Sequence, residues 1–163
     1  MRAAFFCTGL IAGAISSAAA QSPARERTLV ERYAGTYVWD RMLREPPVRR
    51  ELVQLLGSEL AHLEQNLFVA GSVDLIGDHL AISGNAAHRG GEEEAIVCIA
   101  EKPVAVHAAI LTGGRIKVYS RAKGYDGLPI CIMDWITQAN SEHRDRFQKP
   151  ANVDLVPPRP PSS

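Results

Sequence analysis

The sequence predicts an α+β domain, in which a five-stranded antiparallel meander sheet carries helices packed on one face. Three observations lead to this fold class. Apolar residues, mostly leucines, recur at steps of three and four over 48–67, which is typical of an amphipathic helix. Five later segments have the apolar content or the period-2 alternation of strands. The connections between them are too short for the crossovers that parallel strands need, which favours consecutive antiparallel hairpins.

The first 20 residues have the organisation of a secretory signal peptide. Arg2 supplies a positive start, residues 5–15 form an apolar centre, and Ala18-Ala19-Ala20 is a small-residue end typical of a cleavage site. We expect cleavage before Gln21 and a periplasmic location. A membrane anchor is the competing interpretation, because the uncharged run is close to the shortest span that crosses a bilayer. Its alanine, glycine and serine content disfavours that alternative.

Removal of residues 1–20 leaves 143 residues, a length suited to one domain with its own core. We divide them into a flexible lead-in over 21–34, a single domain over 35–150 and a proline-rich disordered tail over 151–163. The mature chain has 17 basic and 18 acidic residues, so its net charge is about −1. A charge this close to neutral disfavours binding to nucleic acid and, after signal cleavage, to a membrane surface.

Two cysteines, Cys98 and Cys131, remain after processing. In an oxidising compartment such a pair suggests one disulfide, although two buried free thiols are also common. The absence of a Cys-x-x-Cys pattern from the sequence argues against redox chemistry.

Two helices are expected before the sheet and one after it. A short helix over 35–44 ends at the Pro46-Pro47 pair, which opens the amphipathic helix that reaches residue 67. Gly57 lies inside this second helix and marks a possible break or bend. The third helix covers 129–140.

The expected strands cover residues 72–76, 79–83, 93–100, 104–111 and 115–121. The strand over 93–100 has apolar residues on both faces, as a central strand does. The last strand alternates, so that Ile116 and Val118 are expected to face the core and Tyr119 the solvent.

A polar loop joins the second and third of these strands, with the sequence Gly84-Asn85-Ala86-Ala87-His88-Arg89-Gly90-Gly91-Glu92. Gly84, Gly90 and Gly91 can adopt backbone angles that other residues resist, so we expect the loop to project and return sharply. His88 lies at its tip. Loops held by a rigid scaffold often carry binding residues, which makes this histidine the main candidate functional residue. An exposed histidine without a role is the alternative.

No catalytic pattern is present in the sequence: there is no Gly-x-Ser-x-Gly, no His-Glu-x-x-His, no phosphate loop and no dinucleotide fingerprint. The five histidines are scattered, without the paired spacing of a metal site. We therefore expect neither an enzyme nor a cofactor. A carrier of metal or of a small ligand, using His88 with the neighbouring glutamates, is a weaker alternative.

The proline-marked helix, the meander and the glycine-bounded histidine loop between two middle strands resemble the Ivy family, periplasmic inhibitors of vertebrate (C-type) lysozyme. Residues 83–90 fall where that family carries its inhibitory loop, Cys-Lys-Pro-His-Asp-Cys. His88 matches the family's histidine, Asn85 and Gly90 stand at the two cysteine positions, and Arg89 replaces the aspartate.

The resemblance implies an exported inhibitor that inserts His88 between the two catalytic carboxyl groups of C-type lysozyme. The inhibitory loop would comprise Gly84, Asn85, His88, Arg89 and Gly90, with Arg89 as a second cation near those carboxylates. Without the ring that the family's cysteines close, this loop needs other bonds to hold its binding shape.

Beside the loop, Glu92, Glu93 and Glu94 could steer a basic lysozyme towards it. The alternative function is a periplasmic binding or scaffold protein of the same fold that does not inhibit lysozyme. Such a protein would use the flat face of the sheet for another partner or for self-association, for example as a homodimer.

Overall fold

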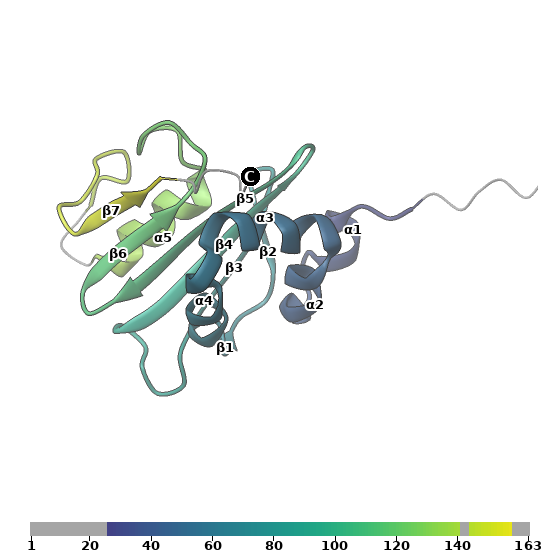
Figure 1. Cartoon of the computed structure of the whole chain (residues 1–163), viewed down its shortest axis with the longest axis horizontal. Helices are drawn as coiled ribbons and strands as arrows, with labels where there is room; N and C mark the ends of the chain where they lie inside the picture. Colours follow the sequence, from purple (N-terminus) through teal and green to yellow (C-terminus); the bar gives the residue numbers. More distant parts are fainter. Residues whose placement is uncertain (1–25, 141–143, 158–163) are drawn as a thin grey trace, which may run out of the picture.

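The computed structural model describes residues 26–140 and 144–157, so the expected signal peptide lies outside the described residues. The helices are α1 (Leu29–Tyr33), α2 (Trp39–Arg44), α3 (Pro46–Leu56), the 3-10 turn η1 (Gly57–Glu59), α4 (Leu60–Asn66) and α5 (Ile130–Ala139). The strands are β1 (Val69–Ala70), β2 (Asp74–Ile76), β3 (His79–Asn85), β4 (Glu93–Glu101), β5 (Val104–Thr112), β6 (Arg115–Tyr119) and β7 (Val153–Val156). Helices and one sheet together make an α+β fold, as predicted (Figure 1).

Within the described residues, the sheet has seven strands in the order β1-β3-β4-β5-β6-β7, with β2 also paired to β3. The predicted strands are present as β2 to β6, and each pairs with the next in antiparallel fashion. The prediction of a five-stranded, purely antiparallel sheet was wrong, because β1 is added beside β3 and β7 pairs with β6 in parallel. A parallel pair needs a crossover connection, and α5 supplies it.

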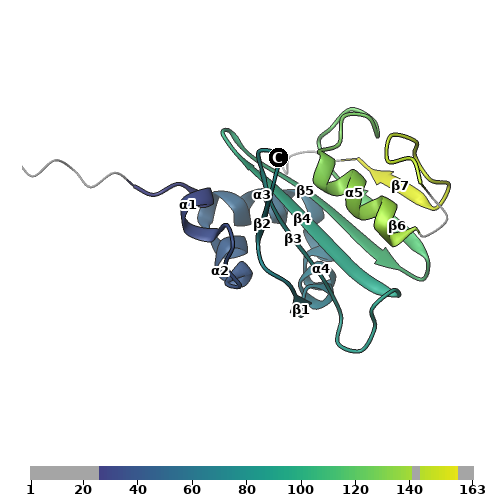
Figure 2. The same ribbon diagram turned by 180° about the vertical axis from the view of Figure 1, so that it is seen from behind.

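Helices cover both faces of the sheet, so the prediction of helices on one face was also wrong (Figures 1 and 2). The helices α1 to α4 lie on one face and α5 lies on the other. The central strand β4 serves both cores: Ala95, Val97 and Ile99 pack on the first side, and Ile96 and Cys98 on the second. The apolar character of this strand on both faces is explained by this double cover.

The strand β6 likewise has core residues on both faces of the sheet. Ile116 and Val118 face the core beneath α5, as predicted. Tyr119 was expected to face solvent, but it is only 4% exposed and belongs to the core on the side of α1 to α4. The alternation along the strand was predicted correctly, but the second layer of helices was not foreseen.

The segments expected to be a lead-in and a tail contain structure. Within 21–34, Thr28 caps α1 in a capping box with Glu31, and the helix buries Leu29 and Tyr33. Within 151–163, β7 joins the sheet through parallel pairing with β6. The predictions of a flexible lead-in and a disordered tail were therefore wrong for α1 and β7.

Two covalent and backbone features shape the helical layers. Gly57 has φ +55° and ends α3, which confirms the predicted break in the leucine-rich helix. Cys98 of β4 and Cys131 of α5 form a disulfide whose Cα atoms are 6.5 Å apart. This bond fastens α5 to the centre of the sheet. None of the helices in the described ranges is long and apolar enough to cross a bilayer.

Candidate inhibitory loop

The loop over residues 86–92 projects from one end of the sheet, between β3 and β4 (Figure 1). The last residue pair of these strands is Asn85 with Glu94, so the ladder runs up to the base of the loop. Ala87, His88 and Arg89 are exposed at its tip. The position of the loop at the end of the two strands leaves its tip open to a partner.

His88 occupies a turn with an unusual backbone. The Arg89 N–H donates to the Ala86 carbonyl oxygen at 3.0 Å, which closes the turn around Ala87 and His88. His88 has φ +62°, and it is the one non-glycine residue with positive φ in the described part of the chain. A positive φ at the third position of a β-turn is usually supplied by glycine or asparagine, and histidine is among the few other residues that tolerate it.

The neck of the loop is held by hydrogen bonds between its two limbs. The Ala86 N–H donates to the Glu93 carbonyl oxygen at 2.9 Å, and Ala86 itself is buried, with 5% exposure. The Asn85 side-chain amide donates to the Ala86 carbonyl oxygen at 2.7 Å. These bonds fix the first limb before the chain reaches the exposed tip.

The returning limb is also hydrogen-bonded. The Arg89 carbonyl oxygen accepts the N–H groups of Glu92, at 3.1 Å, and Glu93, at 3.0 Å. The Gly91 N–H donates to the Glu94 carboxylate at 2.6 Å. Backbone contacts of this kind restrain the loop without a covalent ring.

The three glycines have different roles, and only one matches the expectation of unusual backbone angles. Gly91 has φ +83°. Gly84 has no positive φ, and a Cβ at this position would lie 2.7 Å from the Val69 carbonyl oxygen, so glycine is needed for the close approach of β1. Gly90 also has no positive φ. A Cβ built on it would lie 3.9 Å from the Asn85 Cγ, so the two positions that match the family's cysteines are neighbours in space.

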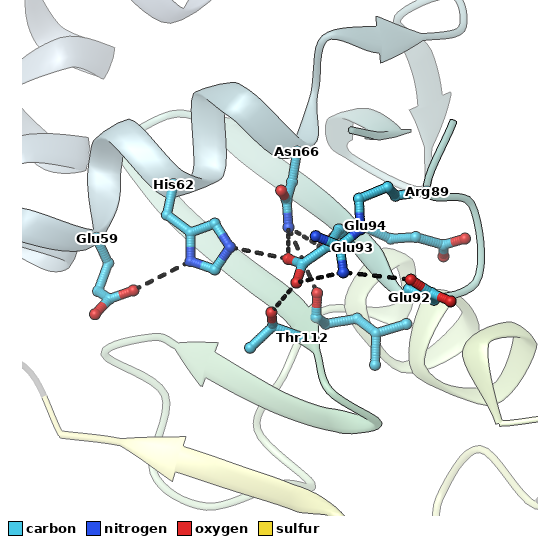
Figure 3. Close-up of polar contacts among 9 residues, drawn as sticks. Glu59, His62, Asn66, Arg89, Glu92, Glu93, Glu94 and Thr112 are labelled. Carbon is cyan, nitrogen blue, oxygen red and sulfur yellow. Dashed lines mark hydrogen bonds and ion pairs between the residues drawn. The ribbon is translucent and has the colours of Figure 1, made fainter. Parts of the chain in front are cut away.

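The three glutamates do not form the common acidic patch that a steering role needs. Glu92 is exposed, and Arg89 Nη2 lies 3.3 Å from its carboxylate. The carboxylate of Glu94 binds the Gly91 N–H. The side chain of Glu93 is only 14% exposed and points into the body of the protein (Figure 3). Any steering contribution therefore falls mainly to Glu92.

Glu93 lies at the centre of a polar cluster that sequence reasoning missed (Figure 3). One carboxylate oxygen lies 3.0 Å from His62 Nε2 and accepts the Asn66 amide at 3.2 Å, both from α4. The other oxygen accepts the Thr112 hydroxyl of β5 and lies 3.7 Å from Arg89 Nη2. On the sequence, the spacing of His62 and Asn66 places them on one helix face, but nothing local indicates their partner.

The hydrogen bond from Thr112 is the largest cause of a low pKa at Glu93, which is lowered to about 2. Burial opposes this shift, and His62 and Asn66 add to it. The carboxylate therefore stays charged at neutral and mildly acidic pH, where it can hold its four partners.

Among the described residues, no second group of titratable side chains forms a candidate site. His107, on β5, lies with its Nδ1 2.7 Å from the Ser120 hydroxyl oxygen. Burial, and then the nearby His79, lower the pKa of His107 to about 4, which keeps this imidazole neutral. In the described part of the chain, no group of three or more histidine, cysteine or acidic side chains is placed to hold a metal ion.

Comparison with known proteins gives one result. The family model described as inhibitor of vertebrate lysozyme (Ivy) matches residues 47–142, which run from the second residue of α3 through α5 and include the loop and the strands β1 to β6. Searches of curated proteins and of solved structures gave no significant match. The matched segment covers more than half of the chain and contains the histidine loop at its centre, so this protein belongs to the Ivy family of lysozyme inhibitors.

Proposed function

We propose that this protein inhibits C-type lysozyme by inserting His88 between the two catalytic carboxyl groups of the enzyme. The observation that carries the proposal is an exposed histidine at the tip of a projecting, hydrogen-bonded loop, in a chain of the Ivy family. Inhibition of this kind needs no chemistry from the inhibitor, because the loop only has to fill the cleft and bind its carboxyl groups.

The imidazole of His88 suits such a target. A retaining glycosidase holds its two carboxyl groups about 5 Å apart. A protonated imidazole has N–H donors on two sides of a small ring, so it can donate one charge-assisted hydrogen bond to each carboxylate.

The hydrogen bonds within the loop reduce the entropic cost of binding. Ordering a flexible residue costs about 1–2 kcal/mol, so a loop of seven free residues would lose much of its affinity. Here both limbs are already bonded, through Ala86 on one side and Glu92 and Glu93 on the other. Only the tip around His88 remains to be fixed by the enzyme.

The positive charge of Arg89 is already paired with neighbouring carboxylates, so less of it is available to bind lysozyme than its place beside His88 implies. Its guanidinium lies 3.3 Å from the Glu92 carboxylate and 3.7 Å from that of Glu93. We therefore assign the main contact with the lysozyme carboxylates to His88 and a supporting role to Arg89.

The test is an inhibition assay with the purified mature protein and a vertebrate C-type lysozyme, measured by cell-wall lysis. The change His88→Ala should raise the inhibition constant by about 100-fold or more, the size expected for a central interface residue. His88→Asn tolerates positive φ and separates loss of the imidazole from a change of backbone. Arg50→Ala, at an exposed position of α3 outside the loop, is the control and should leave inhibition unchanged.

An inhibition constant that does not change in His88→Ala would end the proposed mechanism. If the unmodified protein fails to inhibit any C-type lysozyme, the alternative of a binding or scaffold protein with the same fold would replace it.

We further propose that residues 1–20 direct export, so that the mature protein meets lysozyme in the periplasm. Amino-terminal sequencing of the protein recovered from a periplasmic extract should begin at Gln21. Recovery of a chain that still begins at Met1 in the membrane fraction would favour the membrane-anchor alternative.

A further inference from the structure

Glu93 connects the loop to the helical layer and to the sheet. It is the first residue of β4, directly after the loop. Its side chain contacts three separate elements: α4 through His62 and Asn66, β5 through Thr112, and the loop through Arg89 (Figure 3). The carboxylate thus connects the helical layer, the sheet and the loop.

The backbone of the same residue joins the two limbs of the loop. Its carbonyl oxygen accepts the Ala86 N–H of the outgoing limb at 2.9 Å. Its own N–H donates to the Arg89 carbonyl oxygen of the returning limb at 3.0 Å. A change in the position of Glu93 would therefore move both limbs together.

The body of the protein holds this carboxylate in one place. The Asn66 amide, from a residue only 1% exposed, donates to it and also lies 3.4 Å from the Glu94 carbonyl oxygen. His62 in turn lies 3.5 Å from the Glu59 carboxylate, which orients its ring towards Glu93. A partly buried carboxylate with several partners from different elements has one favourable position, which specifies local geometry.

We propose that Glu93, which is anchored by His62, Asn66 and Thr112, is a positioning residue for the inhibitory loop. Its polar contacts restrain the loop in place of the covalent ring that Asn85 and Gly90 cannot form. The inference rests on the proposed function, since it concerns the same loop. It assigns to Glu93 no contact with lysozyme; the residue acts through the placement of His88.

The experiment compares Glu93→Gln in two backgrounds. The first is the natural chain, and the second carries Asn85→Cys and Gly90→Cys. The 3.9 Å between the Asn85 Cγ and a Cβ on Gly90 is compatible with a disulfide between the new cysteines, and Gly90 needs no positive φ. Formation of the bridge is checked by mass spectrometry before any inhibition constant is measured.

In the natural background, Glu93→Gln should weaken lysozyme inhibition at least 10-fold and speed hydrogen exchange at the Ala86 N–H. In the bridged background the same change should weaken inhibition by no more than about 2-fold, because the ring now holds the loop. Glu51→Gln is the matched control, because this carboxylate of α3 pairs with Arg121 and not with the loop, and it should have little effect in either background. If Glu93→Gln does not fold, Thr112→Val removes a single partner and should show the same pattern with a smaller effect.

Two results would overturn the inference. One is full inhibition by Glu93→Gln in the natural background. The other is an equal loss of inhibition in both backgrounds with the bridge formed, which would mean that Glu93 contributes through overall stability or through direct contact. Failure of the proposed function itself is recognised separately, because His88→Ala would then inhibit as well as the unmodified protein.

Discussion

Acidification should remove the stabilising effect of Glu93, and the structure sets the pH range. In the folded protein the pKa of Glu93 is lowered from its ordinary value of 4.5 to about 2, chiefly by the Thr112 hydrogen bond. The unfolded chain takes up the proton first as the pH falls. The contribution of Glu93 to stability is therefore complete above about pH 4.5 and is lost between about pH 4.5 and 2.

The size of the effect follows from the same values. One pKa unit corresponds to about 1.4 kcal/mol, so the full difference would be about 3 kcal/mol. Glu93 lies at the rim of the sheet, where solvent screens part of its interactions, and we expect about 1–2 kcal/mol. Because Glu93 has several polar partners, this stabilising free energy belongs to the whole cluster and not to one hydrogen bond.

The assay is urea denaturation of the natural protein and of Glu93→Gln at several pH values from 5 to 2. Taking the difference between the two proteins cancels the titration of the other carboxylates. The natural protein should be more stable by about 1–2 kcal/mol at pH 5, and this advantage should shrink steadily towards pH 2. A difference that stays constant over this range would refute the reasoning, since it would mean that the Glu93 charge does not contribute.

Three further predictions concern other parts of the molecule. Replacing Cys98 and Cys131 together by alanine should cost about 3–4 kcal/mol of unfolding free energy, from the 33-residue separation of the bridge, and urea denaturation with no loss of stability would contradict this. His88→Val should cost about 1–2 kcal/mol, because a β-branched side chain is strained at positive φ, whereas His88→Asn should stay within about 0.5 kcal/mol; equal stabilities would show that the turn is not strained. In NMR titration the ring protons of His107 should shift with a midpoint near pH 4, and a midpoint above 6 would show that this imidazole is not buried as described.

The features that the sequence predicted correctly are local. Strand alternation and short connections were enough to place β2 to β6 and their antiparallel pairing. A single glycine, Gly57, was enough to predict the break between α3 and α4. One local signal was overlooked: Thr28 and Glu31 form a capping box, which marks the start of α1.

What the tertiary structure decided depends on contacts between distant residues. The four residues of β7 carry no strong strand signal of their own, and they join the sheet because α5 returns the chain to the edge of β6. That crossover places α5 over Ile116 and Val118 on the second face of the sheet, while the layer of α1 to α4 buries Tyr119 on the first face. Residues that alternate along a strand show that two faces exist, but not what covers each face.

At the candidate site, too, some features follow from the local sequence and others only from the fold. The sequence determined that a histidine stands at the tip of a polar loop between two strands, because strand periodicity and glycines are local properties. It grouped Glu93 with Glu92 and Glu94 as carboxylates that could steer a basic lysozyme towards the loop. Only the fold brings that carboxylate to His62 and Thr112, which lie 31 and 19 residues away along the chain. The partners of this partly buried carboxylate are set by packing in three dimensions, and sequence spacing carries no record of them.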